Sequence, residues 1–109
     1  MDDLQGRIVE IGAGSGTNFS YYPAGAETFA TEPDPHMLKR ARAKLDEIGS
    51  TNIEVRQAPA ERLSFEDASF DHALCTWVLC TVDDLTATRG EIRRVLRPEG
   101  TFRVMEACR

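Results

Sequence analysis

Three glycines and two carboxylates form the pattern in this sequence that is best suited to chemistry. The segment Arg7-Ile8-Val9-Glu10-Ile11-Gly12-Ala13-Gly14-Ser15-Gly16 places an apolar run directly before glycines at alternate positions. Glycine permits a sharp turn and leaves backbone amides open to a ligand that a side chain would otherwise shield. A second carboxylate, Glu32, follows at the distance of about twenty residues at which ribose-binding acids stand in nucleotide sites. We therefore predict a ligand site built on this loop.

The glycine spacing and Glu10 distinguish between nucleotide-like ligands. Dinucleotides favour G-x-G-x-x-G, whereas this loop has alternate glycines and no glycine at position 17, where that pattern needs one. The carboxylate of Glu10 would repel a pyrophosphate, but it would hold a protonated amine, directly or through water. The ligand that these residues indicate is a zwitterionic amino acid joined to a nucleoside.

Residues after the loop supply the remaining surfaces that such a ligand needs. Glu32, at the end of a second predicted strand, is the expected acceptor for two ribose hydroxyls. Pro33 and Met37 follow it and offer apolar surface where an adenine would lie.

The apolar pattern predicts strands that alternate with helices along the whole chain. The clearest helix covers 35–48, because Asp34 can cap it, Pro35 suits its first position and Gly49 ends it. Strands are predicted at 7–11, 27–32, 53–57, 70–76 and 101–106, with a short helix at 17–22, a polar connection at 58–69 and a turn at 97–100. A further helix begins at Asp83 or Asp84, and its predicted buried face consists of Leu85, Thr88, Ile92, Val95 and Leu96. This alternation implies a single open α/β sheet with parallel pairing and right-handed crossovers.

Length and charge restrict the function further. A chain of 109 residues is long enough for one domain, and its net charge of −5 does not indicate a basic surface for nucleic acid. No apolar stretch approaches the roughly 20 residues that span a bilayer, and no signal peptide begins the chain, so a cytoplasmic location is expected. The cysteines and histidines lack metal-type spacing, and no metal is predicted; they are Cys75, Cys80, Cys108, His36 and His72.

Four ordered elements, which together span Ile8 to Glu106, resemble the class I S-adenosylmethionine-dependent methyltransferases. These are Glu-x-Gly-x-Gly-x-Gly at 10–16, the acid Glu32 at a strand end, Phe70-Asp71, and Arg94-Val95-Leu96-Arg97-Pro98-Glu99-Gly100 before the last strand. Asn18-Phe19-x-x-Tyr22-Pro23, Glu32-Pro33-Asp34-Pro35 and the segment 75–82 are similar to a small-molecule branch that contains alkyl thiol methyltransferases. The methyltransferase type 11 domain is the expected subclass.

The resemblance implies a fold and one domain. It implies a Rossmann-like open, mainly parallel sheet with helices on both faces and strand order 3-2-1-4-5. The antiparallel strand pair that usually ends this fold is missing from the sequence, so residues 1–109 are expected to form a single S-adenosylmethionine-binding domain truncated at its C-terminus.

The resemblance also implies a role for particular residues. Glu10 would orient the amino end of S-adenosylmethionine, Glu32 would bind the ribose, and Cys75 would offer its backbone carbonyl to the ammonium group. Trp77 and Cys80 would face the transfer site, while Ala60 and Glu61 would flank the adenine edge. The full set of expected cofactor-binding residues is Glu10, Gly12, Ala13, Gly14, Gly16, Asn18, Phe19, Glu32, Pro33, Met37, Ala60, Glu61, Cys75, Trp77 and Cys80.

Two positions depart from the family pattern. Pro59 stands where many members carry an aspartate that binds the adenine amino group, and Glu99 replaces the usual second glycine of the Pro-Gly-Gly turn. The first departure bears on adenine recognition, and the second has little expected effect.

The favoured function is methyl transfer to a small-molecule acceptor, and the resemblance alone suggests a thiol or a lipid-like molecule. No residue presents itself as a general base, which fits an acceptor that ionises readily, such as a thiol with a pKa of about 8.5. The first alternative is a non-catalytic binding or scaffold domain whose open fifth-strand edge pairs with a partner or forms a homodimer. A nicotinamide-dependent reductase is the second alternative, and the loop spacing opposes it.

Overall fold

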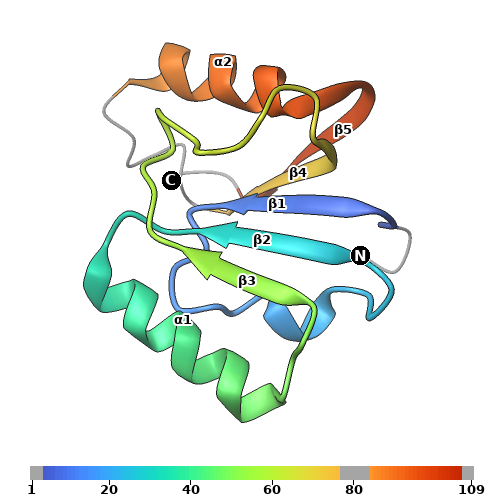
Figure 1. Cartoon of the computed structure of the whole chain (residues 1–109). Coiled ribbons are helices and arrows are strands. Elements are labelled where there is room, and N and C mark those ends of the chain that lie inside the picture. Colours follow the sequence, from blue (N-terminus) through green and yellow to red (C-terminus); the bar gives the residue numbers. More distant parts are fainter. Residues whose placement is uncertain (1–3, 77–83, 107–109) are drawn as a thin grey trace.

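The computed structural model describes residues 4–76 and 84–106, so Trp77 and Cys80 lie outside the described residues. The described elements follow the predicted alternation. They are β1 (Arg7–Ile11), the 3-10 helix η1 (Phe19–Tyr21), β2 (Glu27–Thr31), α1 (Pro35–Ile48), β3 (Ile53–Arg56), β4 (Phe70–Thr76), α2 (Leu85–Val95) and β5 (Leu96–Glu106). The strands pair in parallel in the order β3-β2-β1-β4-β5, which confirms the predicted Rossmann-like topology (Figure 1).

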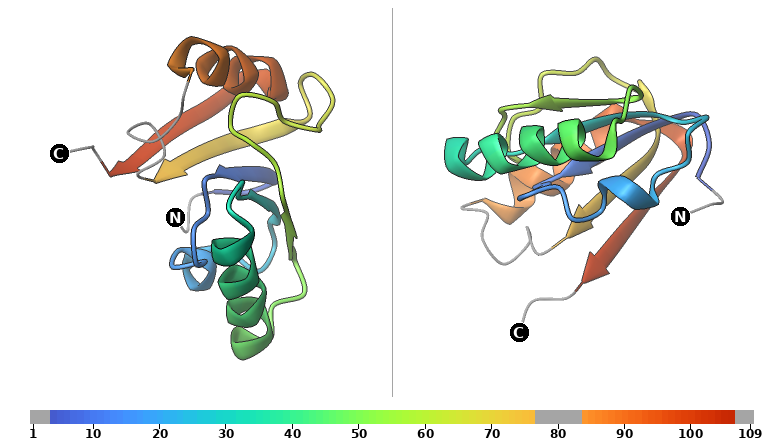
Figure 2. Two further views of the ribbon diagram at one scale, coloured as in Figure 1. Left: turned by 90° about the vertical axis from the view of Figure 1, so that its left-hand side faces the viewer. Right: turned by 90° about the horizontal axis from the view of Figure 1, so that it is seen from below.

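The sheet separates two apolar cores, because alternate residues of its central strands point to opposite faces. On one face, Ile8 and Leu74 pack with residues of η1 and α1. On the other, Val9 and Ile11 pack with the 58–69 connection and with α2. Both helical layers are visible on either side of the strands (Figure 2). β1 is therefore buried on both faces.

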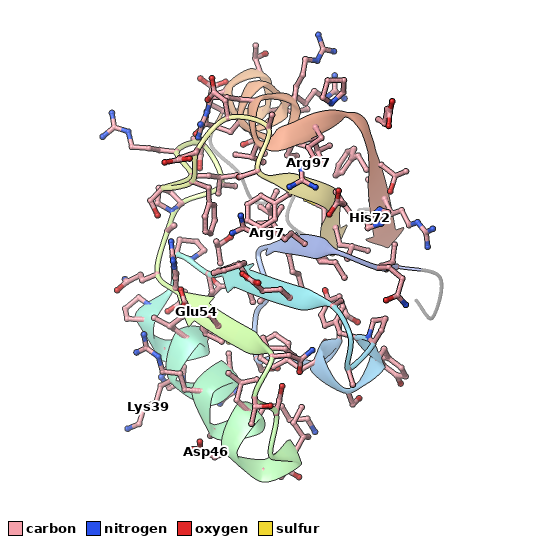
Figure 3. The ribbon with its side chains drawn as sticks, turned by 45° about the vertical axis from the view of Figure 1, so that its right-hand side comes forward. Arg7, Lys39, Asp46, Glu54, His72 and Arg97 are labelled. Carbon is pink, nitrogen blue, oxygen red and sulfur yellow. The ribbon has the colours of Figure 1, made fainter. Side chains whose placement is uncertain are left out.

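The helix caps occur where the sequence predicts them. The Asp34 side chain accepts a hydrogen bond from the His36 amide at 2.9 Å, and Gly49 ends α1 with a left-handed φ of 66°. The outer surface of α1 is charged, and Lys39 and Asp46 point away from the sheet (Figure 3). At α2 the cap is Asp84, whose side chain accepts from the Ala87 amide at 3.0 Å.

Three predicted elements differ from the structure. The helix predicted at 17–22 is only a 3-10 turn at 19–21, because left-handed Gly16 and Pro23 leave too few residues for an α-helix. On α2, Leu85 is exposed and Leu96 already begins β5. The turn predicted at 97–100 lies inside β5, where the register shifts from Leu96 opposite Phe70 to Thr101 opposite His72.

The sheet ends at β5 on one side, and two large apolar residues of that strand are exposed. Phe102 is 41% and Val104 45% accessible, in contrast to the fully buried strands at the centre. Among the described residues, no helix has both the length and the apolar character needed to cross a bilayer.

Candidate functional site

The glycine loop after β1 has the conformation that its composition predicts. Gly12, Gly14 and Gly16 have φ values of 70°, 59° and 85°, which side chains strongly disfavour. A β-carbon on Gly16 would lie 2.6 Å from the Phe19 ring, so this glycine is required by packing. A β-carbon on Gly14 would meet only the Met37 methyl group, at 3.6 Å. The loop is therefore packed beneath Gly16 and open beside Gly14.

Glu32 connects the glycine loop to the start of α1. Its Oε1 accepts from the Gly14 amide at 2.7 Å, and its Oε2 accepts from the Asp34 amide at 3.0 Å. The residue is 7% exposed. Each carboxylate oxygen can accept more than one hydrogen bond, so both retain acceptor capacity for a ligand hydroxyl. Glu32 therefore orders the loop and remains a candidate for the ribose contact.

Glu10 is fully buried on the face of the sheet that η1 and α1 cover. Its Oε2 accepts a hydrogen bond from the Asn18 side-chain amide at 3.0 Å. Its Oε1 is buried and has no hydrogen-bond partner among the described residues. Burial raises the pKa of Glu10 from its usual 4.5 to about 7, a rise that the neighbouring Asn18 amide and Tyr22 hydroxyl limit and the charge of Glu32 enhances. A buried acceptor without a partner is costly, and at a ligand site it marks a contact that the ligand can complete.

The groups around Glu10 make this end of the sheet negative. Among the described residues, neither Glu10 nor Glu32 forms a salt bridge with a cationic side chain. Burial, and then the charge of Glu10, raises the pKa of the Cys75 thiol to about 12. Cys75 is thus a neutral packing residue at pH 7, and it is not a nucleophile. The local charge suits a ligand that carries positive charge.

The segment that contains Ala60 and Glu61 is held on the opposite face of the sheet. Ala60 is buried in the core beneath α2, and Glu61 is half-buried. The Ala58 amide donates to the Glu32 carbonyl at 3.3 Å, which ties the beginning of this segment to the end of β2. The residues predicted to flank the adenine therefore begin directly beside the predicted ribose acceptor.

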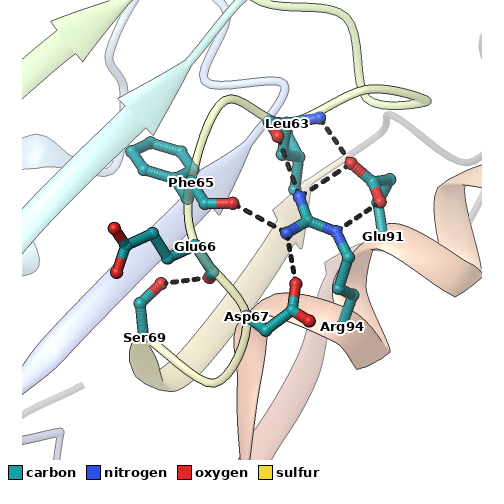
Figure 4. A network of polar contacts seen from close by, with 7 residues as sticks. All are labelled: Leu63, Phe65, Glu66, Asp67, Ser69, Glu91 and Arg94. Carbon is teal, nitrogen blue, oxygen red and sulfur yellow. Dashed lines mark hydrogen bonds and ion pairs between the residues drawn. The ribbon is translucent and has the colours of Figure 1, made fainter.

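Arg94 of α2 forms hydrogen bonds with the next part of that segment, residues 63–67 (Figure 4). Arg94 donates to the Leu63 carbonyl at 2.9 Å, to the Phe65 carbonyl at 2.7 Å and to the Asp67 carboxylate at 2.8 Å. It also contacts both oxygens of Glu91, at 2.7 and 3.0 Å, and Glu91 in turn accepts from the Leu63 amide at 2.8 Å. We call these five residues the Arg94 clamp. The hydrogen bonds from Arg94 lower the pKa of Glu91.

The structure brings most of the predicted site residues to the carboxyl ends of β1, β2 and β4. Pro33 is exposed on the connection to α1, Met37 is half-buried against Gly14, and Phe19 is buried beneath Gly16. Predicted residues in this group are Glu10, Gly12, Ala13, Gly14, Gly16, Asn18, Glu32 and Cys75. Trp77 and Cys80 lie outside the described residues, and whether any of these positions contacts a ligand stays a prediction.

The sequence placed Tyr22 in the Asn18-Phe19-x-x-Tyr22-Pro23 pattern, near the cofactor mouth, without a ligand contact, and it gave Glu91 no part in the site. Tyr22 is 8% exposed, its buried hydroxyl has no hydrogen-bond partner among the described residues, and it lies next to Glu10. Glu91 belongs to the Arg94 clamp. The sequence signal for this pair is that Glu91 precedes Arg94 by three residues on a predicted helix, a spacing at which opposite charges meet. Among the described residues, no group of three or more His, Cys, Asp or Glu side chains could hold a metal ion.

Comparison with known proteins shows the same fold and related sequences. A sequence profile of the methyltransferase domain family matches residues 9–104. Human thiol S-methyltransferase TMT1B is 37% identical over 87% of this chain and 40% of its own length. The phosphatidylethanolamine N-methyltransferase of Cereibacter sphaeroides is 31% identical over 87% of this chain and 47% of its own. The crystal structure of the YcgJ protein from Bacillus subtilis matches with a TM-score of 0.87 and 28% identity, over 92% of this chain and 43% of that one. The chain thus spans less than half the length of these relatives.

Proposed function

This chain belongs to the class I S-adenosylmethionine-dependent methyltransferases, and we propose that it carries the donor site for methyl transfer to a small-molecule thiol. S-adenosylmethionine is the cofactor of this family. The thiol assignment is supported by the relation to thiol S-methyltransferases. A thiol fits such a site because it ionises near pH 8.5, unlike an alcohol.

The residues of the loop fit the proposed donor. Glu10 Oε1, which has no partner among the described residues, would accept from the donor's ammonium group, and Glu32 would accept from its ribose hydroxyls. The open side of Gly14 would admit the donor against the backbone. Ala60 and Glu61 would lie at the adenine edge, in a segment that the Arg94 clamp holds. When bound, S-adenosylmethionine supplies a methyl group already activated by the positive charge on its sulfur.

The contribution of the protein to such a reaction is alignment and shielding from water. In-line displacement requires the acceptor, the methyl carbon and the sulfur to lie on one line, and holding them there is worth several orders of magnitude in rate. Glu10 and Glu32 anchor the donor at two separate points, which fixes the direction in which the methyl group faces. Cys75 remains a protonated thiol and does not compete for the methyl group.

The observation that carries this proposal is the buried Glu10 oxygen without a partner beside an open glycine loop. Calorimetric titration of the chain with S-adenosylmethionine, S-adenosylhomocysteine and NAD tests the donor. We expect saturable binding of the first two and none of NAD; preference for NAD would refute the donor site. Mass spectrometry of a panel of thiols, phenols and amines incubated with S-adenosylmethionine then tests the acceptor. Methylation of phenols or amines but not of thiols would refute the thiol assignment alone.

We also propose a location and an assembly for this chain. The cytoplasm supplies S-adenosylmethionine and keeps thiols reduced, in accord with the free thiol of Cys75. The exposed side chains of Phe102 and Val104 on the edge strand support pairing of β5 with a second copy. Sedimentation measurements test this pairing, and a monomer at all concentrations would exclude it.

A further inference from the structure

The side chains around Glu10 include one polar group that the proposed donor contacts leave unexplained. Tyr22 directly follows η1, and its ring is buried with Phe19 and Ala26 in the core between η1 and the sheet. Its hydroxyl is buried as well, and it has no hydrogen-bond partner among the described residues. A core position that needed only apolar volume would be filled at lower cost by phenylalanine, because burying an unpaired hydroxyl costs roughly 1–3 kcal/mol.

The surroundings of this hydroxyl indicate its use. Tyr22 lies next to the Glu10 carboxyl group, whose charge, after burial, raises the pKa of the phenol well above its usual range. Glu10 Oε1 is the second buried oxygen in this cluster without a partner, while Oε2 already accepts from Asn18. The other titratable groups that influence Glu10 are Glu32 and Cys75, and neither can stabilise a negative charge there.

We propose that Tyr22 is a positioning residue of the donor site, whose hydroxyl stabilises and orients the charged Glu10 carboxylate when a cationic ligand binds. This inference rests on the proposed donor site. Asn18 donates to Oε2, and the Tyr22 hydroxyl is a second donor beside the same carboxyl group. In the unliganded protein Glu10 is protonated in a large fraction of molecules at neutral pH, since burial raises its pKa to about 7. Binding of an ammonium group requires the charged form, and Tyr22 favours that form.

The variant Tyr22→Phe tests this role because it removes only the hydroxyl. Its matched control is Tyr21→Phe, at a neighbouring tyrosine that is 63% exposed. In unliganded protein with 13C-labelled glutamate carboxyl groups, we expect the NMR titration midpoint of Glu10 to rise by about one pH unit in Tyr22→Phe. The midpoint should be unchanged in Tyr21→Phe. An unchanged midpoint in both variants would overturn the inference.

The second measurement is the affinity for S-adenosylhomocysteine between pH 6 and pH 9. We expect the pH at which Tyr22→Phe reaches half of its maximal affinity to move upward with the Glu10 midpoint, and the affinity at pH 7 to fall several-fold. A merely structural role would lower affinity equally at every pH, and that result would also overturn the inference. If the unaltered chain binds no S-adenosylhomocysteine at any pH, the proposed donor site fails, while the titration of unliganded protein still decides whether Tyr22 acts on Glu10.

The coupling can also be measured from the other side, which covers the case in which Tyr22→Phe does not fold. In protein with 13C-labelled tyrosine rings, the Tyr22 resonance should shift as Glu10 ionises near its midpoint, and Glu10→Gln should remove this shift because the carboxylate charge is gone. An identical pH response of the Tyr22 resonance in both proteins would contradict the coupling.

Discussion

Two glutamates of this domain, Glu10 and Glu91, show opposite ways of placing a carboxylate. Glu91 is saturated: it accepts two hydrogen bonds from Arg94 and one from the Leu63 amide, and its pKa is lowered. Glu10 accepts one hydrogen bond from Asn18, keeps one buried oxygen with no partner among the described residues, and has a pKa raised to about 7. Glu91 lies on α2 and Glu10 on β1, and of these two carboxylates Glu10 is the one with a buried, unpartnered oxygen in the described part of the chain.

The difference separates a structural carboxylate from one that awaits a ligand. The Arg94 clamp completes every contact of Glu91 inside the protein, and the result is a fixed 63–67 segment (Figure 4). At Glu10 one buried oxygen is left without a partner among the described residues, and we propose that a bound cation compensates this cost.

The largest expected effect concerns the pH dependence of stability set by Glu10. Its folded-state pKa of about 7 exceeds the usual 4.5, so the folded protein retains a proton that the unfolded chain loses between these values. Stability therefore falls as pH rises from 4.5 to 7, by about 3 kcal/mol in total. Glu10→Gln should abolish this slope in urea unfolding measured from pH 4.5 to 8. An equal slope in the variant would mean that Glu10 is not the buried acid responsible.

Breaking the Arg94 clamp should have the next largest effect. Arg94→Ala leaves two carbonyls and the Glu91 carboxylate without their donor, at a cost of about 2 kcal/mol in unfolding free energy. Arg94→Lys should recover only part of it, because an ammonium group cannot span these acceptors. Urea unfolding at pH 7 measures the unfolding free energy of both variants. A loss of less than about 0.5 kcal/mol in Arg94→Ala, the value of an exposed ion pair, would show that the clamp does not stabilise the fold.

A smaller effect is expected in the glycine loop, where Gly16 is packed against a side chain and Gly14 is open. Gly16→Ala should destabilise the fold by about 1 kcal/mol more than Gly14→Ala, because only the first β-carbon would collide with the Phe19 ring. Gly14→Ala should instead weaken binding of S-adenosylhomocysteine at least tenfold, since its methyl group enters the open side of the loop. Thermal unfolding and calorimetry compare the two; equal affinities in the unaltered chain and Gly14→Ala would place the donor elsewhere.

The smallest effect is expected for Glu91 itself. Its lowered pKa means that it contributes stability above the usual pKa of a glutamate, and that this contribution is lost as pH falls through the folded-state value. Glu91→Gln should therefore cost less than about 1 kcal/mol at pH 7, because an amide still meets part of the network, and progressively less as pH falls through the lowered folded-state pKa of Glu91. A variant whose stability loss grows on acidification would contradict this sign.

Most of the fold was predictable because its determinants are local in sequence. Asp34, Pro35 and Gly49 mark the ends of α1, and the alternate glycines mark the loop after β1. The Arg94 clamp was not predictable, since Arg94 contacts backbone carbonyls up to 31 residues away that any sequence would provide. The start of β5 was also missed, because the register shift opposite β4 allows Pro98 and Gly100 to lie within a paired strand.

At the candidate site, the sequence indicated which residue types bind a ligand, but it did not indicate how deeply these residues are buried. The position of Glu10 two residues before the first glycine indicated a ligand contact, whereas its unpartnered oxygen is a property of the folded cluster with Asn18 and Tyr22. Tyr22 reads as ordinary packing in the sequence, and only the folded structure places it beside Glu10.

The most direct test of this account is the proton released when S-adenosylhomocysteine binds. Calorimetry at pH 7 in two buffers of different ionisation enthalpy measures that number of protons. With a Glu10 pKa of about 7, binding of the ammonium group should release about half a proton per molecule from the unaltered chain, and none from Glu10→Gln. Binding without proton release from the unaltered chain, or with equal release from both proteins, would contradict the claim that Glu10 awaits the cation.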